Sequence, residues 1–510
     1  MDSQLVNQLF KQLFRHHPAC QSQKHLRQLT TATATAHKGH RVQQHHSRQQ
    51  RRPYSSRRPG AKPPVGDETR WQQRAKLLNQ DMTEEYKRAP MVTAADLWGR
   101  KERPRRVKML LRDFIEDSLY NPNYGYFSKN VTIFTPGEPF DFPALRDETE
   151  FQNVLSQRYV EFEDKLDEVT PSDTRQLWYT PTELFRPYYG EAIARYLVAN
   201  YKLTTYPYHD LIIYEMGAGR GTLMLNILDY IRDMDPDVYA RTQYKVIEIS
   251  DSLAKVQAST LLRSAAGRGH VKKVEIINKS IFEWSQPVPS PCFFLAFEVF
   301  DNFAHDAIRY DLATEQPMQA VVLISESNDF FEFYTPTLDP VAERYFRVRD
   351  VATCGRYKVP YPTTKLGKWV SSIKPFSSTM SEPEYIPTRL MQFYDVLSKY
   401  FPAHRLLTSD FHSLPDAVPG LNAPIVQTRY QRRPVPVTTP LVHQGYFDIM
   451  FPTDFRVSEL VYQAITGKLS RVMSHEEFMR SWAYLEETET QSGENPLLKW
   501  YKNASVMYTV

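Results

Sequence analysis

The sequence is organised around residues 211–257, which read LIIYEMGAGRGTLMLNILDYIRDMDPDVYARTQYKVIEISDSLAKVQ. The apolar run 211–214 is typical of a buried parallel strand, and three glycines follow it closely: Gly217, Gly219 and Gly221. From Thr222 the apolar residues recur at helical spacing, and a second strand-like run ends on Glu248. The stretch therefore predicts a strand, a glycine turn, a helix and a second strand.

This arrangement indicates a nucleoside cofactor. A glycine turn lets backbone N–H groups approach a ligand at a helix N-terminus, and a carboxylate at the tip of the second strand, here Glu248, accepts hydrogen bonds from ribose hydroxyls. The spacing is G-x-G-x-G rather than the G-x-G-x-x-G of dinucleotide sites, and Glu215 precedes it. A carboxylate there repels a pyrophosphate but suits an amino group and a sulfonium. We therefore expect S-adenosyl-L-methionine, bound by Glu215, the three glycines, Thr222 and Glu248.

The same residues resemble a known family. The motifs E-x-G-x-G-R-G-T-L-M, from Glu215, and V-x-E-I-S, from Val246, are similar to those of the MidA family of mitochondrial methyltransferases. The animal member of that family methylates an arginine in a subunit of respiratory complex I during assembly. The family usually has proline where this chain has Ala218. The resemblance implies an α/β fold of the Rossmann-like class I methyltransferase type, with a mostly parallel seven-stranded sheet, an N-terminal helical extension and inserted cap segments.

Four further segments are similar to motifs of the family. Residues 121–127 resemble its D-P-x-x-G-Y-Y segment, and residues 180–191 resemble T-S-P-E-(I/V)-x-x-x-F-G-E with two extra residues before Gly190. Residues 298–301 resemble N-E-x-x-D-A-x-P without the preceding Asn, and residues 445–455 resemble G-x-x-D-(L/I)-T-x-x-V-D-F. The resemblance implies that the 180–191 segment closes over the cofactor and the substrate.

Carboxylates are the candidates for catalysis. The apolar run 292–297 predicts a buried strand that delivers Glu298 to the carboxyl edge of the sheet, where ligands bind. Methyl transfer to a guanidinium requires that a proton is lost and that a planar cation is held, and carboxylates do both. We expect Glu298, Asp301 and, from the closing segment, Glu183 to act there. The alternative for Glu298 is that it only caps a helix or orders a loop.

Further candidates follow the later strands. Ser280 and Ile281 come just after the third predicted strand, where the adenine ring is expected. Residues 409–411 stand where the family has a D-Y-G turn. Asp448 and Asp454 either help to close the substrate side or are solvated turn residues.

The chain divides into five predicted segments. A basic leader comes first, followed by a helical extension that ends in an insertion, a cofactor-binding Rossmann-like core, a second insertion or cap, and the C-terminal part of the methyltransferase domain. Their ranges are 1–66, 67–178 with the insertion at 128–178, 179–335, 336–404 and 405–510.

Several elements are predicted outside the central stretch. We expect a helix at 71–88 and an amphipathic helix that begins at Val107 and is stopped by Pro122. A hairpin is expected at 319–334, and residues 405–412 should return to the sheet.

The first 66 residues differ in charge from the rest of the chain. They carry 12 Lys and Arg but a single acid, Asp2, whereas the rest carries 51 basic against 58 acidic groups. A basic, acid-poor N-terminus with an amphipathic start is typical of a mitochondrial presequence, which predicts the mitochondrial matrix; the alternative is a disordered basic arm for RNA. Because the body is mildly acidic, nucleic acid is not the predicted partner.

Other classes of protein are excluded by the composition. The three cysteines, Cys20, Cys292 and Cys354, are far apart and the 14 histidines form no H-x-x-x-H, so no metal site is predicted. No run of eighteen apolar residues exists that would predict a membrane span.

Two functions of different class remain. The first is an active mitochondrial methyltransferase that acts on arginine in a protein, with a respiratory-chain subunit as the candidate substrate. The second is an assembly or binding factor that keeps the cofactor fold without turnover, which the missing Asn before Glu298 favours. A changed acceptor such as RNA is a further alternative.

Overall fold

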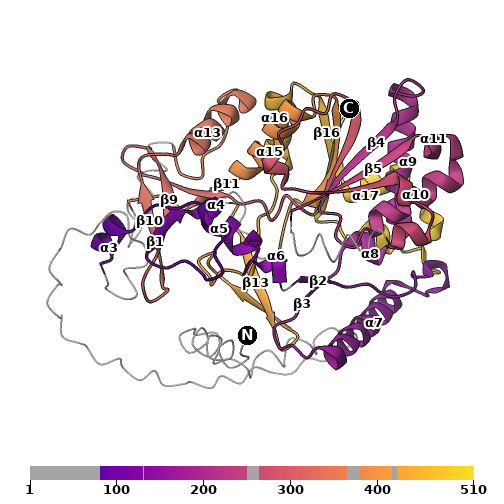
Figure 1. The fold of residues 1–510 in the computed structure, drawn as a ribbon, viewed down its shortest axis with the longest axis horizontal. Helices are drawn as coiled ribbons and strands as arrows, with labels where there is room; N and C mark the ends of the chain where they lie inside the picture. The colour runs from indigo at the N-terminus through magenta and orange to yellow at the C-terminus, as the bar shows by residue number, and fades with distance from the viewer. Residues whose placement is uncertain (1–80, 130, 250–262, 364–378, 416–421) are drawn as a thin grey trace, which may run out of the picture. The chain divides into compact units, whose positions relative to one another are not determined.

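The computed structural model describes residues 81–129, 131–249, 263–363, 379–415 and 422–510 (Figure 1). All of these residues belong to one compact unit, residues 67–510. The predicted leader lies outside the described residues, and so do the first ten residues of the helix expected at 71–88. Of that helix, the structure has α3 (Thr83–Arg88).

A seven-stranded sheet forms the centre of the unit. In sheet order its strands are β16 (Ser470–Ser474), β17 (Ala504–Thr509), β12 (His404–Phe411), β7 (Cys292–Phe297), β4 (Leu211–Met216), β5 (Thr242–Glu248) and β6 (Val274–Asn278). The pairs from β12 to β6 are parallel, whereas β17 is antiparallel to both of its neighbours. The predicted Rossmann-like class I fold with a mostly parallel seven-stranded sheet is confirmed.

Strand order reverses between β4 and β7, because β5 and β6 lie on one side of β4 and β12 lies beyond β7. In an open α/β sheet, ligands bind outside the carboxyl ends of the strands at such a reversal. The glycine turn follows β4 and Glu298 follows β7. The topology therefore puts the two predicted halves of the site at the point where this fold binds ligands.

Helices cover both faces of the sheet, as parallel strands require. One face packs against α9 (Tyr188–Thr204), α10 (Thr222–Met234) and α17 (His475–Trp482), and the other packs against α15 (Thr388–Tyr400) and α16 (Phe455–Thr466) (Figure 1). Helix α15 lies in the segment 336–404 that we predicted as an insertion or cap. That prediction was wrong for α15, because Phe393 and Leu397 are buried in the same core as Phe294 of β7.

A second sheet of five strands lies outside the central one. It contains β1 (Val107–Leu110), β8 (Asp306–Tyr310), β9 (Pro317–Ile324), β10 (Phe330–Thr335) and β11 (Glu384–Ile386). The expected hairpin is confirmed, since β9 and β10 pair antiparallel with Phe330 opposite Ile324. The segment 179–335 is not one continuous core, however, because β8, β9 and β10 leave the central sheet for this second one.

The helix expected from Val107 begins four residues later. Residues 107–110 form β1, which pairs antiparallel with β9, and α5 (Leu111–Tyr120) follows. The N-terminal extension is therefore mixed rather than helical. The apolar residues from Val107 recur at helical spacing, but the backbone of residues 107–110 forms hydrogen bonds with β9 instead.

The segment 128–178, in which we found no period, contains the 22-residue helix α7 (Glu148–Val169). Only Phe151, Leu155 and Glu163 of α7 are buried, so its apolar pattern is weak. Glu163 accepts two 3.0 Å hydrogen bonds from Arg429 of β13 (Ile425–Tyr430). This buried ion pair ties α7 to a three-stranded sheet that also contains β14 (Arg433–Val437) and β15 (Asp448–Met450).

Smaller elements connect these parts. A parallel pair is formed by β2 (Val131–Ile133) and β3 (Gln176–Trp178). Other helices are α4 (Ala94–Leu97), α6 (Tyr126–Lys129), α8 (Pro181–Leu184), α11 (Pro236–Ala240), α13 (Pro340–Thr353) and α18 (Pro496–Lys499).

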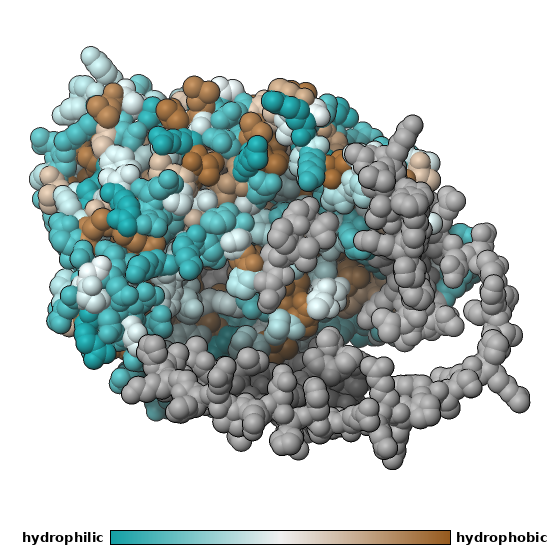
Figure 2. Space-filling model, turned by 180° about the vertical axis from the view of Figure 1, so that it is seen from behind, coloured by the Kyte–Doolittle hydropathy of each residue, from teal (hydrophilic) through white to brown (hydrophobic). Residues whose placement is uncertain are grey.

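The surface is mixed in polarity. On the face that Figure 2 shows, apolar side chains are scattered among hydrophilic ones. Within the residues that the structure describes, no helix has both the length and the apolar composition to cross a bilayer.

Two segments that resemble the MidA family pack directly on one another. Gly445 has a φ of +81°, and a Cβ built on it would lie 1.7 Å from the carbonyl oxygen of Tyr124. The backbone of the 445–455 segment therefore contacts the backbone of the 121–127 segment, where a side chain has no room.

We predict that Gly445→Ala destabilises the protein far more than Gly467→Ala. Both glycines have positive φ, but nothing lies within 4 Å of a Cβ at Gly467. The free energy of unfolding should fall by about 3 kcal/mol or more for Gly445→Ala, and by about 1 kcal/mol for Gly467→Ala. Urea unfolding followed by circular dichroism measures both losses, and equal losses would contradict the close backbone contact.

Candidate functional site

Two glycines of the turn between β4 and α10 have side chains packed close to where a Cβ would stand. Gly217 and Gly219 have φ of +74° and +53°. A Cβ on Gly217 would lie 2.9 Å from Cγ1 of Val299, and one on Gly219 would lie 2.9 Å from Cδ1 of Ile133. Gly221, with a φ of +77°, precedes α10, whose N-terminus has no side-chain cap. The first N–H groups of α10 are thus without a capping side chain beside a bare backbone turn, which fits an adenosyl cofactor.

Two carboxylates lie at the carboxyl ends of adjacent strands. Glu215 of β4 is buried, and its Oε2 accepts a 2.8 Å hydrogen bond from the hydroxyl of Tyr244 in β5. Burial raises the pKa of Glu215 to about 7, and the hydrogen bond from Tyr244 opposes this shift. Glu248 is the last residue of β5, and its Oε1 accepts a hydrogen bond from the backbone N–H of Ile249.

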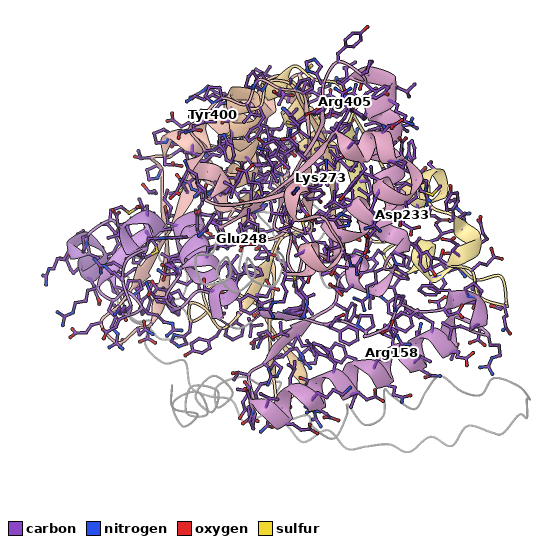
Figure 3. The ribbon with its side chains drawn as sticks, turned by 45° about the vertical axis from the view of Figure 1, so that its right-hand side comes forward. Arg158, Asp233, Glu248, Lys273, Tyr400 and Arg405 are labelled. Carbon is purple, nitrogen blue, oxygen red and sulfur yellow. The ribbon has the colours of Figure 1, made fainter. Side chains whose placement is uncertain are left out.

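Glu248 stands where a ribose ligand is expected. Glu248, labelled in Figure 3, is the last residue of β5. Lys273, also labelled there, precedes the parallel strand β6 and so lies toward the opposite edge of the sheet. A carboxylate on this strand end, next to the strand that carries the glycine turn, is positioned to accept hydrogen bonds from the hydroxyls of a nucleoside.

Glu183 lies beside the first residue of α10. Its buried side chain, in α8, accepts a hydrogen bond from the hydroxyl of Thr222. Its other oxygen, Oε2, is 3.7 Å from Nη1 of Arg186. Glu183, which we predicted for catalysis, therefore contacts a predicted cofactor residue directly.

Ser280 and Ile281 have local structural partners. Ser280 begins a short 3-10 turn, Ile281–Glu283, and its Oγ accepts a hydrogen bond from the N–H of Phe282. The side chain of Ile281 is buried with Met216 and Ile247. Their side chains support the end of β6, so contact with an adenine ring remains a prediction.

The loop after β7 has an unusual backbone. Glu298 has a φ of +52°, which is uncommon for a residue with a side chain. Asp410, at the end of β12, accepts hydrogen bonds from the N–H groups of Val299 (3.0 Å) and Phe300 (2.7 Å). The N–H of Glu298 itself donates to the carbonyl of Ser409 (2.9 Å). These three bonds hold the strained turn, and the turn presses Val299 against Gly217.

Four carboxylates gather around this loop: Glu298, Asp301, Asp410 and Asp448. Asp301 and Asp410 are buried, and Oδ1 of Asp301 has no hydrogen-bond partner among the described residues. Asp448 accepts a 2.9 Å hydrogen bond from Nδ2 of Asn302. Within the described part of the chain, no lysine or arginine forms an ion pair with any of the four. The loop therefore carries a concentration of uncompensated acidic groups.

Burial raises the pKa of every carboxyl in this group. It raises the pKa of Glu298 to about 8, with a further contribution from the charge of Asp410. It raises the pKa of Asp448 to about 7 and that of Asp410 to about 6. For Asp301, burial comes first and the charges of Asp410 and Asp448 follow, so its pKa lies well above the usual range. The group is ready to release protons when a cation arrives.

Sequence reasoning missed part of this group. Asp410 was noted only as a turn residue, although it ends the strand that pairs with β7. For Asp448 and Asp454 we left two readings open, and the structure separates them. Asp448 is buried beside Asp301, whereas Asp454 is exposed and caps the N-terminus of α16. An acid at the end of a strand adjacent to β7 was the available signal for Asp410.

A cavity of about 940 Å³ is lined by residues of α13, β11, α15 and α16 and by residues 412–414 and 452–454. It meets the loop after β7 at Phe300 and His305, and none of Glu183, Glu215, Glu248, Glu298 and Asp301 lines it. Among the described residues, no group of His, Cys, Asp and Glu is arranged to hold a metal ion.

Comparison with known proteins gave consistent similarities. Residues 192–473 match the model of a family described as "Putative S-adenosyl-L-methionine-dependent methyltransferase". The chain is 27% identical over 387 residues to the "Protein arginine methyltransferase NDUFAF7 homolog, mitochondrial" of Schizosaccharomyces pombe, covering 74% of this chain and 80% of the relative. It is 21% identical over 426 residues to the protein of the same name from Saccharomyces cerevisiae, covering 79% and 90%.

Among solved structures, one of the most similar is a COG1565 superfamily member from Burkholderia thailandensis, described as a likely methyl transferase and bound to S-adenosyl-homocysteine. The TM-score is 0.49 with 14% sequence identity, over 79% of this chain and 88% of that one.

We predict that Glu248→Ala weakens the binding of S-adenosyl-L-methionine at least tenfold. The substitution deletes a charged hydrogen-bond acceptor, whose loss costs about 1.5–3 kcal/mol. Isothermal titration calorimetry measures the affinity. Glu275→Ala, which removes an exposed carboxylate from the neighbouring strand β6, is the control and should bind as the unaltered protein does. Unchanged affinity in Glu248→Ala would remove the ribose assignment.

We predict that the protein loses stability as the pH rises from about 5 to 8, and that Glu298→Gln reduces this loss. The folded state holds a proton on Glu298 up to a pKa of about 8, whereas the ordinary value is 4.5. Since the unfolded state binds fewer protons in this window, stability falls with rising pH. Glutamine resembles the protonated acid and does not titrate.

Thermal unfolding at pH 5 and pH 8 tests this expectation. Glu298→Gln should have a Tm close to that of the unaltered protein at pH 5 and about 1–3 °C above it at pH 8. Glu168→Gln, on the exposed side of α7, should behave as the unaltered protein at both pH values. The same Tm difference for Glu298→Gln at both pH values would contradict a raised pKa of Glu298 in this pH window.

Proposed function

The chain belongs to the S-adenosyl-L-methionine-dependent methyltransferase family whose model it matches over residues 192–473, and on that premise we propose that it methylates arginine side chains of a protein. One observation carries the proposal: the loop that bears Glu298 is in contact with the glycine turn, since a Cβ on Gly217 would lie 2.9 Å from Val299. A cluster of acids thus adjoins the turn at which the methyl donor is expected.

The residues around the glycine turn fit the cofactor. When bound, S-adenosyl-L-methionine supplies an electrophilic methyl group on a sulfonium. We assign the bare backbone of Gly217, Gly219 and Gly221 to close approach of the ligand, and Glu248 to the ribose hydroxyls. Glu215, in the strand before the turn, is assigned to the amino-acid end, where its negative charge is compatible with an amino group and a sulfonium.

The acidic group fits a guanidinium as acceptor. A guanidinium presents five N–H donors in one plane, and a carboxylate binds two of them in parallel. Because the pKa of Glu298 is raised to about 8, the arrival of a cation favours its ionised form. A carboxylate with that high basicity is a competent acceptor for the proton that the nitrogen loses while its new N–C bond forms. Glu298 is therefore our candidate for the general base, with Asp301 as its closest acidic neighbour in sequence.

Glu183 has a supporting role in this proposal. It accepts a hydrogen bond from Thr222 at the start of α10, so it joins the closing segment 180–191 to the cofactor turn. From there it orients the first turn of α10 rather than acting on the acceptor.

The relatives and the leader suggest where the protein works. Both yeast relatives are named as mitochondrial arginine methyltransferases. The acid-poor, basic leader of residues 1–66 is typical of import into the matrix. We propose the mitochondrial matrix as the location and a protein there, with a respiratory-chain subunit as the first candidate, as the substrate.

A second candidate function is supported by one feature of the site. Phe297 stands immediately before Glu298, where the MidA family has Asn, so an amide side chain is replaced by an aromatic ring beside the candidate base. This favours a binding factor that holds the cofactor and a client protein without transferring the methyl group.

An assay of methyl transfer from labelled cofactor to proteins of a mitochondrial extract distinguishes the two candidate functions. We expect a labelled protein band whose intensity falls about 100-fold or more with Glu298→Gln, because a positioned base contributes at least that factor. Cofactor affinity should change less than threefold, and Glu168→Gln should label as the unaltered protein does. Mass spectrometry of the band should find methylarginine. Cofactor binding without any labelled band would favour the binding factor.

A further inference from the structure

Two tyrosines from distant parts of the chain flank the acidic loop. Tyr189, near the start of α9, has its ring 6.3 Å from that of Phe297, the residue before Glu298. Tyr501, which follows α18, has its ring 6.4 Å from that of Phe411, the residue after Asp410. The ring of His475 packs beside both tyrosine rings, with centroid-to-centroid distances of 6.1 Å to Tyr189 and 6.0 Å to Tyr501. The ends of β7 and β12 are therefore lined by aromatic rings.

The hydroxyl of Tyr501 is buried without a partner. The side chain is 6% exposed, and its oxygen has no hydrogen-bond partner among the described residues. Leaving a buried hydroxyl unsatisfied costs about 1–3 kcal/mol, so such groups call for an explanation. A group supplied by a ligand explains this one.

Glu298 acts on both tyrosines electrostatically. Burial comes first in raising the pKa of each hydroxyl, and the negative charge of Glu298 is the next cause for Tyr189 and for Tyr501. Both hydroxyls therefore remain protonated near neutral pH. They lie within the field of the Glu298 carboxylate and do not compete with it for a proton.

We propose that Tyr501 lies on the acceptor side of the site and selects a guanidinium: its buried, unpartnered hydroxyl accepts a hydrogen bond from the arginine that Glu298 holds. The proposal rests on the proposed function, since it names residues that recognise the same substrate. A guanidinium is planar and weakly hydrated, and it stacks on aromatic rings, whereas the ammonium of lysine is a strongly hydrated point charge. A planar fork of N–H donors can reach the Glu298 carboxylate and the Tyr501 hydroxyl together, which favours arginine over lysine.

Tyr501 accepts a hydrogen bond and takes no proton in this scheme. As the nitrogen forms its bond to the methyl carbon, the carbon–sulfur bond breaks with its electron pair on sulfur. The proton that the nitrogen loses goes to Glu298. Tyr501 fixes which face of the guanidinium lies toward the glycine turn, so it is a specificity-determining residue.

Tyr501→Phe tests the proposal, with Tyr196→Phe as a matched control. Tyr196, in α9, is 2% exposed and its hydroxyl also lacks a partner among the described residues, but its ring contacts are with Phe478, Trp482 and Tyr508. Each substitution removes one unsatisfied buried hydroxyl. Both variants should therefore keep or raise the Tm, which separates a binding role from a structural one.

The probes are N-acetyl-arginine methylamide and the corresponding lysine compound, titrated into the full chain saturated with S-adenosylhomocysteine. We expect the arginine probe to bind more tightly than the lysine probe. Tyr501→Phe should bind the arginine probe about tenfold more weakly, because one hydrogen bond to a charged donor is lost, and Tyr196→Phe should bind it as the unaltered protein does. Equal binding by the two variants, equal binding of the two probes, or no binding of the arginine probe would each overturn the proposal.

Methyl transfer to a protein acceptor, measured beside probe binding, distinguishes a failure of this proposal from a failure of the proposed function. If the arginine probe binds with the expected pattern but no protein is labelled, the proposed methylation fails and the recognition of a guanidinium stands. If protein is labelled and Tyr501→Phe has the same KM for the acceptor as Tyr196→Phe, the methylation stands and the role of Tyr501 is wrong.

Discussion

The site depends on one carboxylate that binds backbone rather than substrate. Asp410 accepts hydrogen bonds from the N–H groups of Val299 and Phe300, and these bonds hold Glu298 in a left-handed conformation. A non-glycine residue in that region costs about 1–3 kcal/mol, so the surroundings must over-determine it. The same turn sets Val299 on Gly217. Through this contact the end of β12 fixes the distance between the acidic loop and the glycine turn.

Protonation lowers the cost of burying the acidic group at pH values below the raised pKa of each carboxyl. Isolated buried carboxylates are costly, and the structure offers no basic partner to Glu298, Asp301, Asp410 or Asp448 among the described residues. Their raised pKa values lower that cost by keeping protons on the group until a cation replaces them. In the proposed function, a group with raised pKa values favours a cationic acceptor, because a bound cation stabilises the ionised carboxylates.

Segments far apart in the chain complete the site. Ile133 of β2 closes one side of the glycine turn, and β2 pairs with β3, which follows the long helix α7. The buried Arg429–Glu163 ion pair connects α7 to β13. Strand β13 pairs in turn with β15, whose first residue is Asp448. Breaking one partner of such a pair is costly because the other charge stays buried. The segment that we predicted as an insertion is therefore part of the support of the acidic group.

The sequence by itself determined the parts of this protein that local pattern encodes. The glycine turn, β4, β7 and the return of β12 were predicted correctly because glycine spacing and short apolar runs are local signals, and the resemblance implied a mostly parallel seven-stranded sheet. Tertiary structure decided the rest. Residues 107–110 became a strand because β9 offered hydrogen bonds, and α15 joined the core because its apolar face met Phe294. Asp410, Asp448 and Tyr501 are buried because distant segments of the chain meet around the ends of β7 and β12, and no local pattern records such contacts.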